Sequence, residues 1–289
     1  LNGYPRTTNP LLEKEDVISF RNFWSCGTST AVSVPCMFSI HERSSFDDQE
    51  ARSTENVLDI LQRVGVNVLW LDNNSDSKGV ADRVPHENYK SPEKNPVCDI
   101  ECRDEGMLKN LQSYIDSHPQ GDILIVLHQM GTHGPAYYKR YPDQFKVFTP
   151  TCETNQLEKC SEEEINNTYD NAILYTDYFL SEVIKLLKAN DVYFESAMLY
   201  MSDHGESLGE KNLYLHGLPY LIAPDVQKRV PVIMWFGEIL SHEVNIDSLR
   251  QRVDQEYSHD NLFHTLLGLM EAETSVYNKD MDLIEHEEE

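Results

Sequence analysis

Four apolar runs, separated by segments with helical periodicity, constrain the fold of this chain more than any other feature. The runs cover residues 66–71, 122–128, 197–202 and 230–236, and helices are predicted at 54–64, 161–189 and 258–270. Runs that are apolar at nearly every position are typical of strands buried on both faces of a sheet. The alternation therefore predicts an α/β fold, with a central, mostly parallel sheet and helices on both faces, in a single domain over residues 1–289.

The limits of the first predicted helix follow from its capping residues. Thr54 is a plausible N-cap, because its hydroxyl can accept a hydrogen bond from a free backbone N–H of the first turn. Gly65 is predicted to end the helix, since glycine readily adopts the left-handed conformation that follows a last turn.

The balance of charge excludes several partners. The chain has 24 Lys and Arg residues against 49 Asp and Glu residues, which gives a net charge of −25. Such a surface repels nucleic acids and anionic membrane surfaces, so no nucleic-acid partner is expected. A phosphate-bearing substrate would need local cations or metal charge. No run approaches the roughly 20 apolar residues of a membrane span.

Both ends of the chain carry an expectation. The sequence begins at Leu1 in what reads as the middle of a loop, so we expect a fragment of a longer protein. No apolar surface stripe argues against a monomer. The acidic end, residues 280–289, is predicted to be a disordered tail.

The six cysteines form three close pairs along the chain. They are Cys26 with Cys36, Cys98 with Cys102, and Cys152 with Cys160. Fifteen disulfide connectivities are possible, although local pairing is the simplest because each pair brackets a loop-like stretch. The second pair has no companion at zinc-ribbon spacing. Disulfides would indicate an oxidising compartment such as a periplasm or the cell exterior, and six free thiols in a cytosolic enzyme are the alternative.

Polar residues follow three of the apolar runs, where ligands bind in open α/β sheets. Asp203 and His204 leave the third run together, a carboxylate and an imidazole suited to Zn²⁺ or Mn²⁺. His133 follows the second run, and His216 lies just downstream of the Asp–His pair. Three histidines in loops on one face favour a metal site, whereas an isolated Asp-His-Gly would more simply be a strand-end turn. His128 is interpreted as packing at its strand end.

Two further loops could bind phosphate. Residues 25–35 (SCGTSTAVSVP) predict a loop entering a helix, whose free N–H groups could hold an anion and whose hydroxyls could be nucleophiles if a metal activated one. A helix cap without chemistry is the alternative, which that segment alone favours. Residues 72–79 (DNNSDSKG) carry amides and a lysine at a strand end, although an ordinary turn explains them at least as well.

Longer motifs combine these segments. They are NGYPR at 2–6, FRNFWSCGTSTAVSVPCM at 20–37, DNNSDSKGV at 72–80, LHQMGTHGPAY at 127–137, SDHGESLG at 202–209 and YLHG at 214–217. Together and in this order they resemble the periplasmic domain of the lipid A phosphoethanolamine transferases, the family that includes the mobile colistin-resistance enzymes. The fold implied is that of the alkaline-phosphatase and sulfatase superfamily, in agreement with the alternation of strands and helices.

The resemblance implies a role for each candidate residue. Thr30 would be the nucleophile and also a zinc ligand, beside the zinc ligands Asp203 and His204. His133 and His216 would bind a second zinc ion or the phosphoryl group, so that one or two zinc ions are expected.

The resemblance also implies substrate-binding residues and disulfides. Asn74, Lys78 and Glu206 match positions that bind the phosphoethanolamine substrate. All three cysteine pairs match disulfide positions of the family, although the pair at 98 and 102 encloses a shorter loop than in some relatives. The family's remaining zinc ligand, a glutamate, and its N-terminal membrane helices would precede Leu1. The implied location is the periplasmic face of a bacterial inner membrane.

The activity implied is zinc-dependent transfer of phosphoethanolamine from phosphatidylethanolamine to a lipid A phosphate, through a phosphoethanolamine–threonine intermediate. The resemblance thereby also implies a role in lipopolysaccharide modification and in polymyxin and colistin resistance. The alternatives are a related phosphoglycerol transferase or phosphodiesterase and a non-catalytic, zinc-stabilised envelope module. A sulfatase would need Cys or Ser in a Cys/Ser-x-Pro-x-Arg setting, which the sequence Cys36-Met37-Phe38 lacks.

Overall fold

The computed structural model describes residues 4–285, so that Asn2 and Gly3 of the first motif and residues 286–289 lie outside the described part. Its helices are α1 (Thr30–Met37), α2 (Asp48–Ser53), α3 (Val57–Arg63), α4 (Leu111–Asp116), α5 (Glu162–Asn190), α6 (Ile246–Arg252) and α7 (Asp260–Leu269). Its strands are β1 (Ile18–Phe20), β2 (Phe23–Trp24), β3 (Asn67–Asp72), β4 (His86–Asn88), β5 (Ile123–His128), β6 (Ala197–Met201), β7 (Ser207–Leu208), β8 (Tyr214–Leu215), β9 (Val232–Phe236) and β10 (Tyr257–Ser258). No helix among residues 4–285 combines the length and apolarity that a membrane crossing requires.

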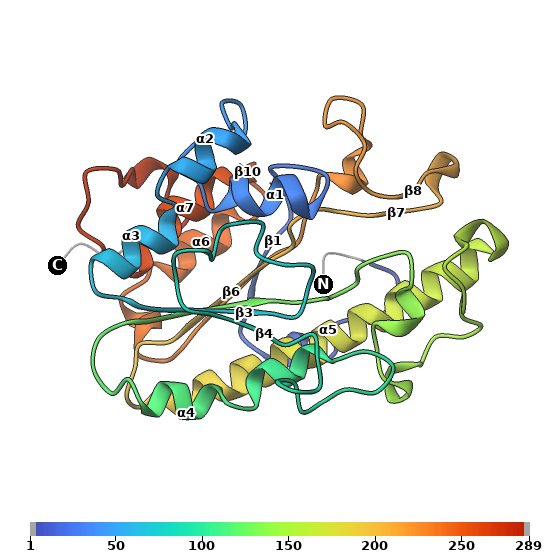
Figure 1. Ribbon diagram of the computed structural model, residues 1–289, viewed down its shortest axis with the longest axis horizontal. Helices are drawn as coiled ribbons and strands as arrows, with labels where there is room; N and C mark the ends of the chain where they lie inside the picture. Colours follow the sequence, from blue (N-terminus) through green and yellow to red (C-terminus); the bar gives the residue numbers. More distant parts are fainter. Residues whose placement is uncertain (1–3, 286–289) are drawn as a thin grey trace.

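The strands of two three-stranded sheets, β4-β3-β5 and β1-β9-β6, form a layer between two groups of helices (Figure 1). β10 with β2 and β7 with β8 form separate two-stranded sheets. α4 and α5 lie on one side of this layer, and α1, α3 and α7 lie on the other. The α/β fold predicted from the sequence is thus confirmed.

The strand directions refine the predicted sheet. β3 pairs in parallel with β4 and β5, with Asp72 opposite His128 at the carboxyl ends. β9, in contrast, lies between β1 and β6 and is antiparallel to both. The parallel arrangement is therefore confirmed for β3, β4 and β5, and the fold as a whole is mixed. Apolar runs do not report strand direction, because burial on both faces is the same for either orientation.

Alternation along β3 shows why its sequence is apolar throughout. Val68 and Trp70 pack in a core cluster with α3 and α7, whereas Leu69 and Leu71 pack in a second cluster with α5. Successive side chains of a strand point to opposite faces, and helices cover both faces here. Each side chain from Val68 to Leu71 is therefore buried in one of the two core clusters.

The first predicted helix begins later than the sequence analysis placed it. Asn56, not Thr54, is the N-cap of α3, since its side chain accepts hydrogen bonds from the N–H groups of Leu58 and Asp59. The Asp59 carboxylate accepts a bond from the N–H of Asn56 in return, which completes a capping box. Thr54 instead ends α2, where its hydroxyl donates to Glu50 O at 2.9 Å. A reciprocal pair of bonds satisfies two free donors, which one threonine could not do.

The expected disordered tail is wrong for its described part. Leu283 and Ile284 are 1% and 2% exposed and belong to a core cluster with Phe20 and Phe23. The N–H of Leu283 also donates to Thr265 Oγ1 at 3.0 Å. Two aliphatic side chains among the acidic ones hold this segment against the domain. Residues 286–289, which the prediction also included, lie outside the described range.

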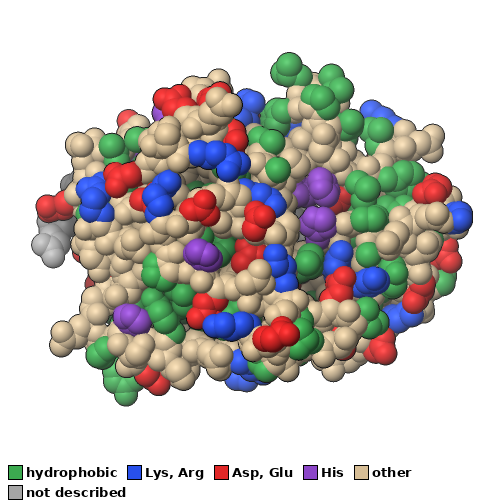
Figure 2. All heavy atoms as spheres, in the orientation of Figure 1, with side chains coloured by type: hydrophobic (Ala, Val, Ile, Leu, Met, Phe, Trp, Pro, Cys, Tyr) green, Lys and Arg blue, Asp and Glu red, His purple; other side chains and the backbone are tan. Residues whose placement is uncertain are grey.

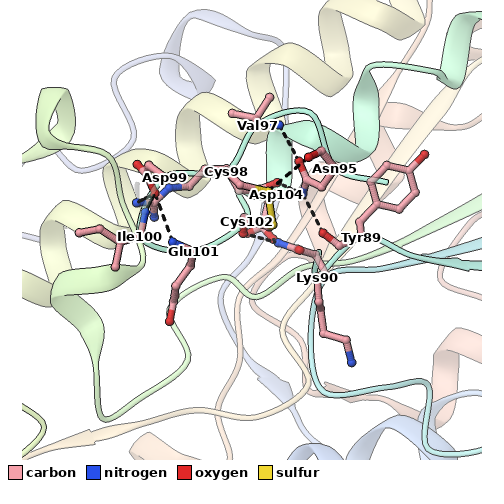
Figure 3. The surroundings of a disulfide bond; sticks show 12 residues. Tyr89, Lys90, Asn95, Val97, Cys98, Asp99, Ile100, Glu101, Cys102 and Asp104 are labelled. Atoms are coloured by element: carbon pink, nitrogen blue, oxygen red, sulfur yellow. Dashed lines mark hydrogen bonds and ion pairs between the residues drawn. A yellow bond between two sulfur atoms is a disulfide. The ribbon is translucent and has the colours of Figure 1, made fainter. Parts of the chain in front are cut away.

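The three disulfides pair the cysteines locally, as the simplest connectivity predicts: Cys26–Cys36, Cys98–Cys102 and Cys152–Cys160. Asn95 supports the second of these loops by donating to the carbonyls of Tyr89 and Arg103, each at 2.9 Å (Figure 3). Asp104 follows directly and accepts bonds from the N–H groups of Met130 and Gly131. Asp104, two residues after the disulfide loop, therefore holds the segment between β5 and His133 in place.

Candidate active site

The hydroxyl-rich segment before α1 folds through its own side chains. Ser25 Oγ donates to Gly27 O at 2.6 Å, and Gly27 N donates to Ser33 Oγ at 2.8 Å. The Cys26–Cys36 disulfide ties the same segment to the last turn of α1. Thr30 is the first residue of the helix, and none of these contacts uses its hydroxyl. The segment is thus a loop entering a helix, as its sequence predicts.

Three predicted ligands converge although two of them are 174 residues apart along the chain. Thr30 Oγ1 lies 3.4 Å from His204 Nε2, and the same nitrogen lies 3.6 Å from Asp203 Oδ2. His204 Nδ1 is 2.9 Å from Gly205 O, a distance at which it donates a hydrogen bond. Donation from Nδ1 leaves the lone pair of Nε2 facing the hydroxyl and the carboxylate.

Asp203 has the properties of a metal ligand. Its Oδ2 is buried and has no hydrogen-bond partner among residues 4–285. Burial alone would raise the pKa of Asp203, but His204 and the Thr30 hydroxyl together hold that pKa below its usual value. A buried, unpaired carboxylate oxygen is costly unless a cation compensates it. The carboxylate, the imidazole and the hydroxyl therefore suit a Zn²⁺ ion.

A second group of donors adjoins the first. The ligand atoms of His204, Glu206 and His216 all lie within 4.8 Å of one another. His216 Nδ1 lies 3.1 Å from Glu206 Oε2, and this hydrogen bond raises the pKa of His216. The ring of His133 lies 5.8 Å from that of His216, and burial lowers the pKa of His133. The two pKa values are thus shifted in opposite directions, and His216 is the more basic of the two outer histidines.

Asn74 and Lys78 are placed differently from the other predicted site residues. Asn74 Nδ2 donates to Gln129 O at 2.7 Å, and its Oδ1 accepts from Ser75 N at 2.6 Å. Lys78 Nζ pairs with Asp76 Oδ1 at 3.0 Å and lines a small cleft that also contains Arg52 and Arg83. These contacts are those of an ordered turn, as the alternative interpretation of residues 72–79 expects.

Two histidines near the site, His128 and His259, make contacts that the sequence did not predict. His128 does pack at its strand end, with its ring centroid 5.4 Å from that of Trp70. It also bonds Asp72 across the parallel strands, with Nδ1 2.9 Å from Oδ2. His259, in contrast, has no distinguishing neighbour in the sequence and was missed.

His259 joins the two segments that carry the candidate ligands. It is 0% exposed, its Nδ1 accepts from Cys26 N at 3.0 Å, and its Nε2 lies 3.0 Å from Ser202 O. Cys26 precedes Thr30 in the hydroxyl-rich segment, and Ser202 directly precedes Asp203. One neutral imidazole, protonated at Nε2, therefore fixes the hydroxyl segment to the carboxyl end of β6.

We expect His259 to make stability depend on pH. Burial lowers its pKa to about 4, so the unfolded chain takes up a proton at higher pH than the folded chain does. Stability should therefore fall as pH drops from about 6.5, the ordinary histidine value, towards 4. The loss attributable to His259 between pH 7 and 4.5 is about 2 kcal/mol.

Urea unfolding of the metal-free chain at both pH values measures this loss. A His259→Gln variant should be less stable at pH 7 but should lose about 2 kcal/mol less on acidification. His242→Gln, at an exposed position, is the matched control and should behave as the parent does. Equal acid sensitivity of the His259→Gln variant and the parent would contradict the assignment.

The fold and the site together describe a mixed α/β domain with a candidate metal-dependent active site, in which a hydroxyl, a carboxylate and histidines come together. Residues 1–272 match the sulfatase family, and the chain belongs to that family. Its fold and its family, as expected from the motifs, are thus confirmed.

Within this family the chain is similar to phosphoethanolamine transferases. It is 50% identical over 289 residues to phosphoethanolamine transferase EptA of Salmonella typhimurium. The alignment covers 99% of this chain and 53% of that protein. It is 47% identical over 279 residues to phosphatidylethanolamine transferase Mcr-1 of Escherichia coli, covering 94% and 50%. The chain therefore spans about half the length of these curated relatives.

A solved structure agrees with both. The soluble domain of lipooligosaccharide phosphoethanolamine transferase A from Neisseria meningitidis superposes with a TM-score of 0.92 at 43% identity. The match covers 98% of this chain and 86% of that one. The resemblance read from the motifs therefore extends to the whole described domain.

Proposed function

We propose that this chain is a catalytic domain that transfers phosphoethanolamine from phosphatidylethanolamine to a phosphate of lipid A, on the periplasmic side of a bacterial inner membrane. The names of its relatives support the transferred group, and three disulfides support an oxidising compartment. The observation that carries the proposal is the meeting of Thr30 Oγ1 with His204 Nε2 and Asp203 Oδ2.

Zinc fits the residues present. Thr30, Asp203 and His204 would hold one ion. Glu206 and His216, whose ligand atoms lie within 4.8 Å of each other and of His204, together with the neighbouring His133, would hold a second ion or the phosphoryl group. When bound, zinc lowers the pKa of a coordinated hydroxyl and attracts phosphoryl oxygens. Asn74 and Lys78 are proposed to contact the substrate once it displaces their turn contacts.

The hydroxyl of Thr30 is the proposed nucleophile. Its oxygen attacks phosphorus as the hydroxyl proton is lost, the bond from phosphorus to the diacylglycerol oxygen breaks, and that oxygen takes up a proton as diacylglycerol leaves. Phosphoethanolamine remains on Thr30 as an ester. An oxygen of a lipid A phosphate then attacks the same phosphorus from the opposite side and releases Thr30. His216, made more basic by Glu206, would supply positive charge beside the phosphoryl oxygens in its protonated form. His133 Nδ1 lies 2.8 Å from Gly134 O, so the N–H of the neutral ring donates there, and its Nε2 keeps a lone pair that suits a metal ligand.

Trapping the intermediate tests the proposal. The zinc-loaded chain is mixed with a short-chain phosphatidylethanolamine, and its intact mass and tryptic peptides are measured. We expect one phosphoethanolamine group, mapped to Thr30. An adduct on another residue, or consumption of donor without any adduct, would contradict the scheme. A phosphoglycerol adduct, formed preferentially from a mixture with phosphatidylglycerol, would favour the related transferase instead.

A further inference from the structure

The loop between β8 and β9 presents apolar side chains to solvent. Leu221 and Ile222 are 95% and 71% exposed, and Val226 is 41% exposed. The loop projects at the top of Figure 1, and Figure 2 shows hydrophobic side chains protruding there, close to histidine side chains on the same face. Exposed aliphatic neighbours at a loop tip are costly in water and often mark a contact surface.

Both roots of this loop are bonded to the candidate active site. At the first root, Gly217 N donates to Thr28 O at 2.8 Å, and Thr28 Oγ1 donates to Leu218 O at 2.6 Å. Thr28 lies two residues before Thr30. The tip is therefore positioned directly by the segment that carries the proposed nucleophile.

The second root is fixed to the other side of the site. Gly205, which follows His204, donates its N–H to Gln227 O at 3.1 Å. A Cβ on Gly205 would lie 2.0 Å from Val226 O, so only glycine permits this close approach. The buried side chain of Gln227 donates to Ser207 Oγ at 2.9 Å. Movement of the tip relative to the site is restricted at both ends.

Residues next to the tip include an aromatic ring and basic groups. The ring of Tyr220, which directly precedes Leu221, has Arg43 Cζ at 4.3 Å and Lys228 Nζ at 5.4 Å from its centroid, and Lys228 Nζ also pairs with Asp225 Oδ1 at 3.3 Å. Exposed aliphatic side chains beside an amphipathic aromatic ring and a basic group are the side-chain types that meet hydrocarbon and headgroups at a membrane interface.

We propose that this loop, with Leu221 and Ile222 at its tip, inserts into the surface of a phospholipid bilayer and holds the candidate active site at headgroup depth. The net charge of −25 disfavours general electrostatic attraction to an anionic membrane, so apolar insertion must supply the binding. Two side chains are also too few for a stable protein interface, which buries roughly 800 Å² on each partner. The lipid nature of the donor rests on the proposed function, whereas the docking surface does not.

Sedimentation with phosphatidylcholine vesicles tests the docking without any substrate. We expect the parent chain to partition onto the vesicles and a Leu221→Asp/Ile222→Asp variant to bind at least about tenfold more weakly. The control is Val192→Asp/Tyr193→Asp, which removes another exposed pair, 74% and 80% exposed, directly after α5. This control should bind as the parent does.

Turnover separates docking from the proposed function. With a soluble chromogenic phosphoethanolamine diester, the loop variant should retain the rate of the parent within about twofold, but with phosphatidylethanolamine in vesicles it should lose about tenfold. Equal vesicle binding by parent and loop variant, or no binding by either, would overturn the docking surface. A parent dimer that the loop substitutions convert to a monomer would assign the loop to a second copy instead. If the parent binds vesicles but consumes neither donor, the proposed function fails while the docking surface stands.

Discussion

Replacing Thr30 by Ala should abolish covalent labelling and lower the transfer rate by roughly 10⁴-fold or more, the scale seen when an enzyme loses its nucleophile. The reason is chemical, because no other hydroxyl contacts His204 Nε2 among the hydrogen bonds of residues 4–285. Stability should change little, since the Thr30 side chain caps no helix and its removal leaves a small space. Transfer to a lipid A acceptor, followed by mass spectrometry of the product, measures the rate.

A neighbouring hydroxyl provides the matched control for this variant. Ser29 is the N-cap residue of α1, yet its side chain makes no capping hydrogen bond. Ser29→Ala removes a hydroxyl one residue from Thr30 and should retain transfer within a few-fold. Transfer that survives Thr30→Ala, or that is lost equally in both variants, would show that the nucleophile lies elsewhere.

Asp203→Asn should remove zinc and, with it, activity. The amide keeps the shape of the carboxylate but not its charge, so zinc affinity should fall by more than about 100-fold, beyond the usual cost of losing a supporting partner. The parent should gain about 2.7 kcal/mol of stability at a zinc concentration of about 100 times Kd, and the variant should gain almost none. Metal analysis after dialysis and thermal unfolding with and without zinc measure both effects.

Asp254→Asn is the matched control for the loss of an aspartate charge. Asp254 is exposed and pairs with Arg21 at the surface, so its substitution should leave zinc binding unchanged. If Asp203→Asn binds zinc as tightly as the parent, the proposed metal site is wrong. In a non-catalytic, zinc-stabilised module, Asp203→Asn would also lose the stabilisation by zinc, but neither parent nor variant would transfer phosphoethanolamine. Measuring transfer beside stability therefore separates an enzyme from such a module.

The sequence indicated which residues could form the candidate site, but it did not indicate the residues that hold them in position. Asp203 and His204 were marked as candidates because a polar pair directly follows an apolar run, whereas Thr30 was singled out within its hydroxyl-rich loop only by the resemblance to the transferase family. The support from His259 was not visible, because its partner Cys26 is 233 residues away and no local pattern marks a histidine inside a core. The placement of Asn74 and Lys78 in an ordered turn was likewise open until their contacts were known.

The sequence by itself determined the apolar strands, the long helix α5, and the local pairing favoured for the cysteines. Each of these depends on interactions between residues a few positions apart, which periodicity and capping chemistry record directly. Tertiary structure alone decided the antiparallel direction of β9, the burial of Leu283 and Ile284, and the fixing of the apolar loop tip to both sides of the site. These features depend on contacts between distant segments, whose energies are set by the packing of the whole domain and leave no periodic trace in the chain.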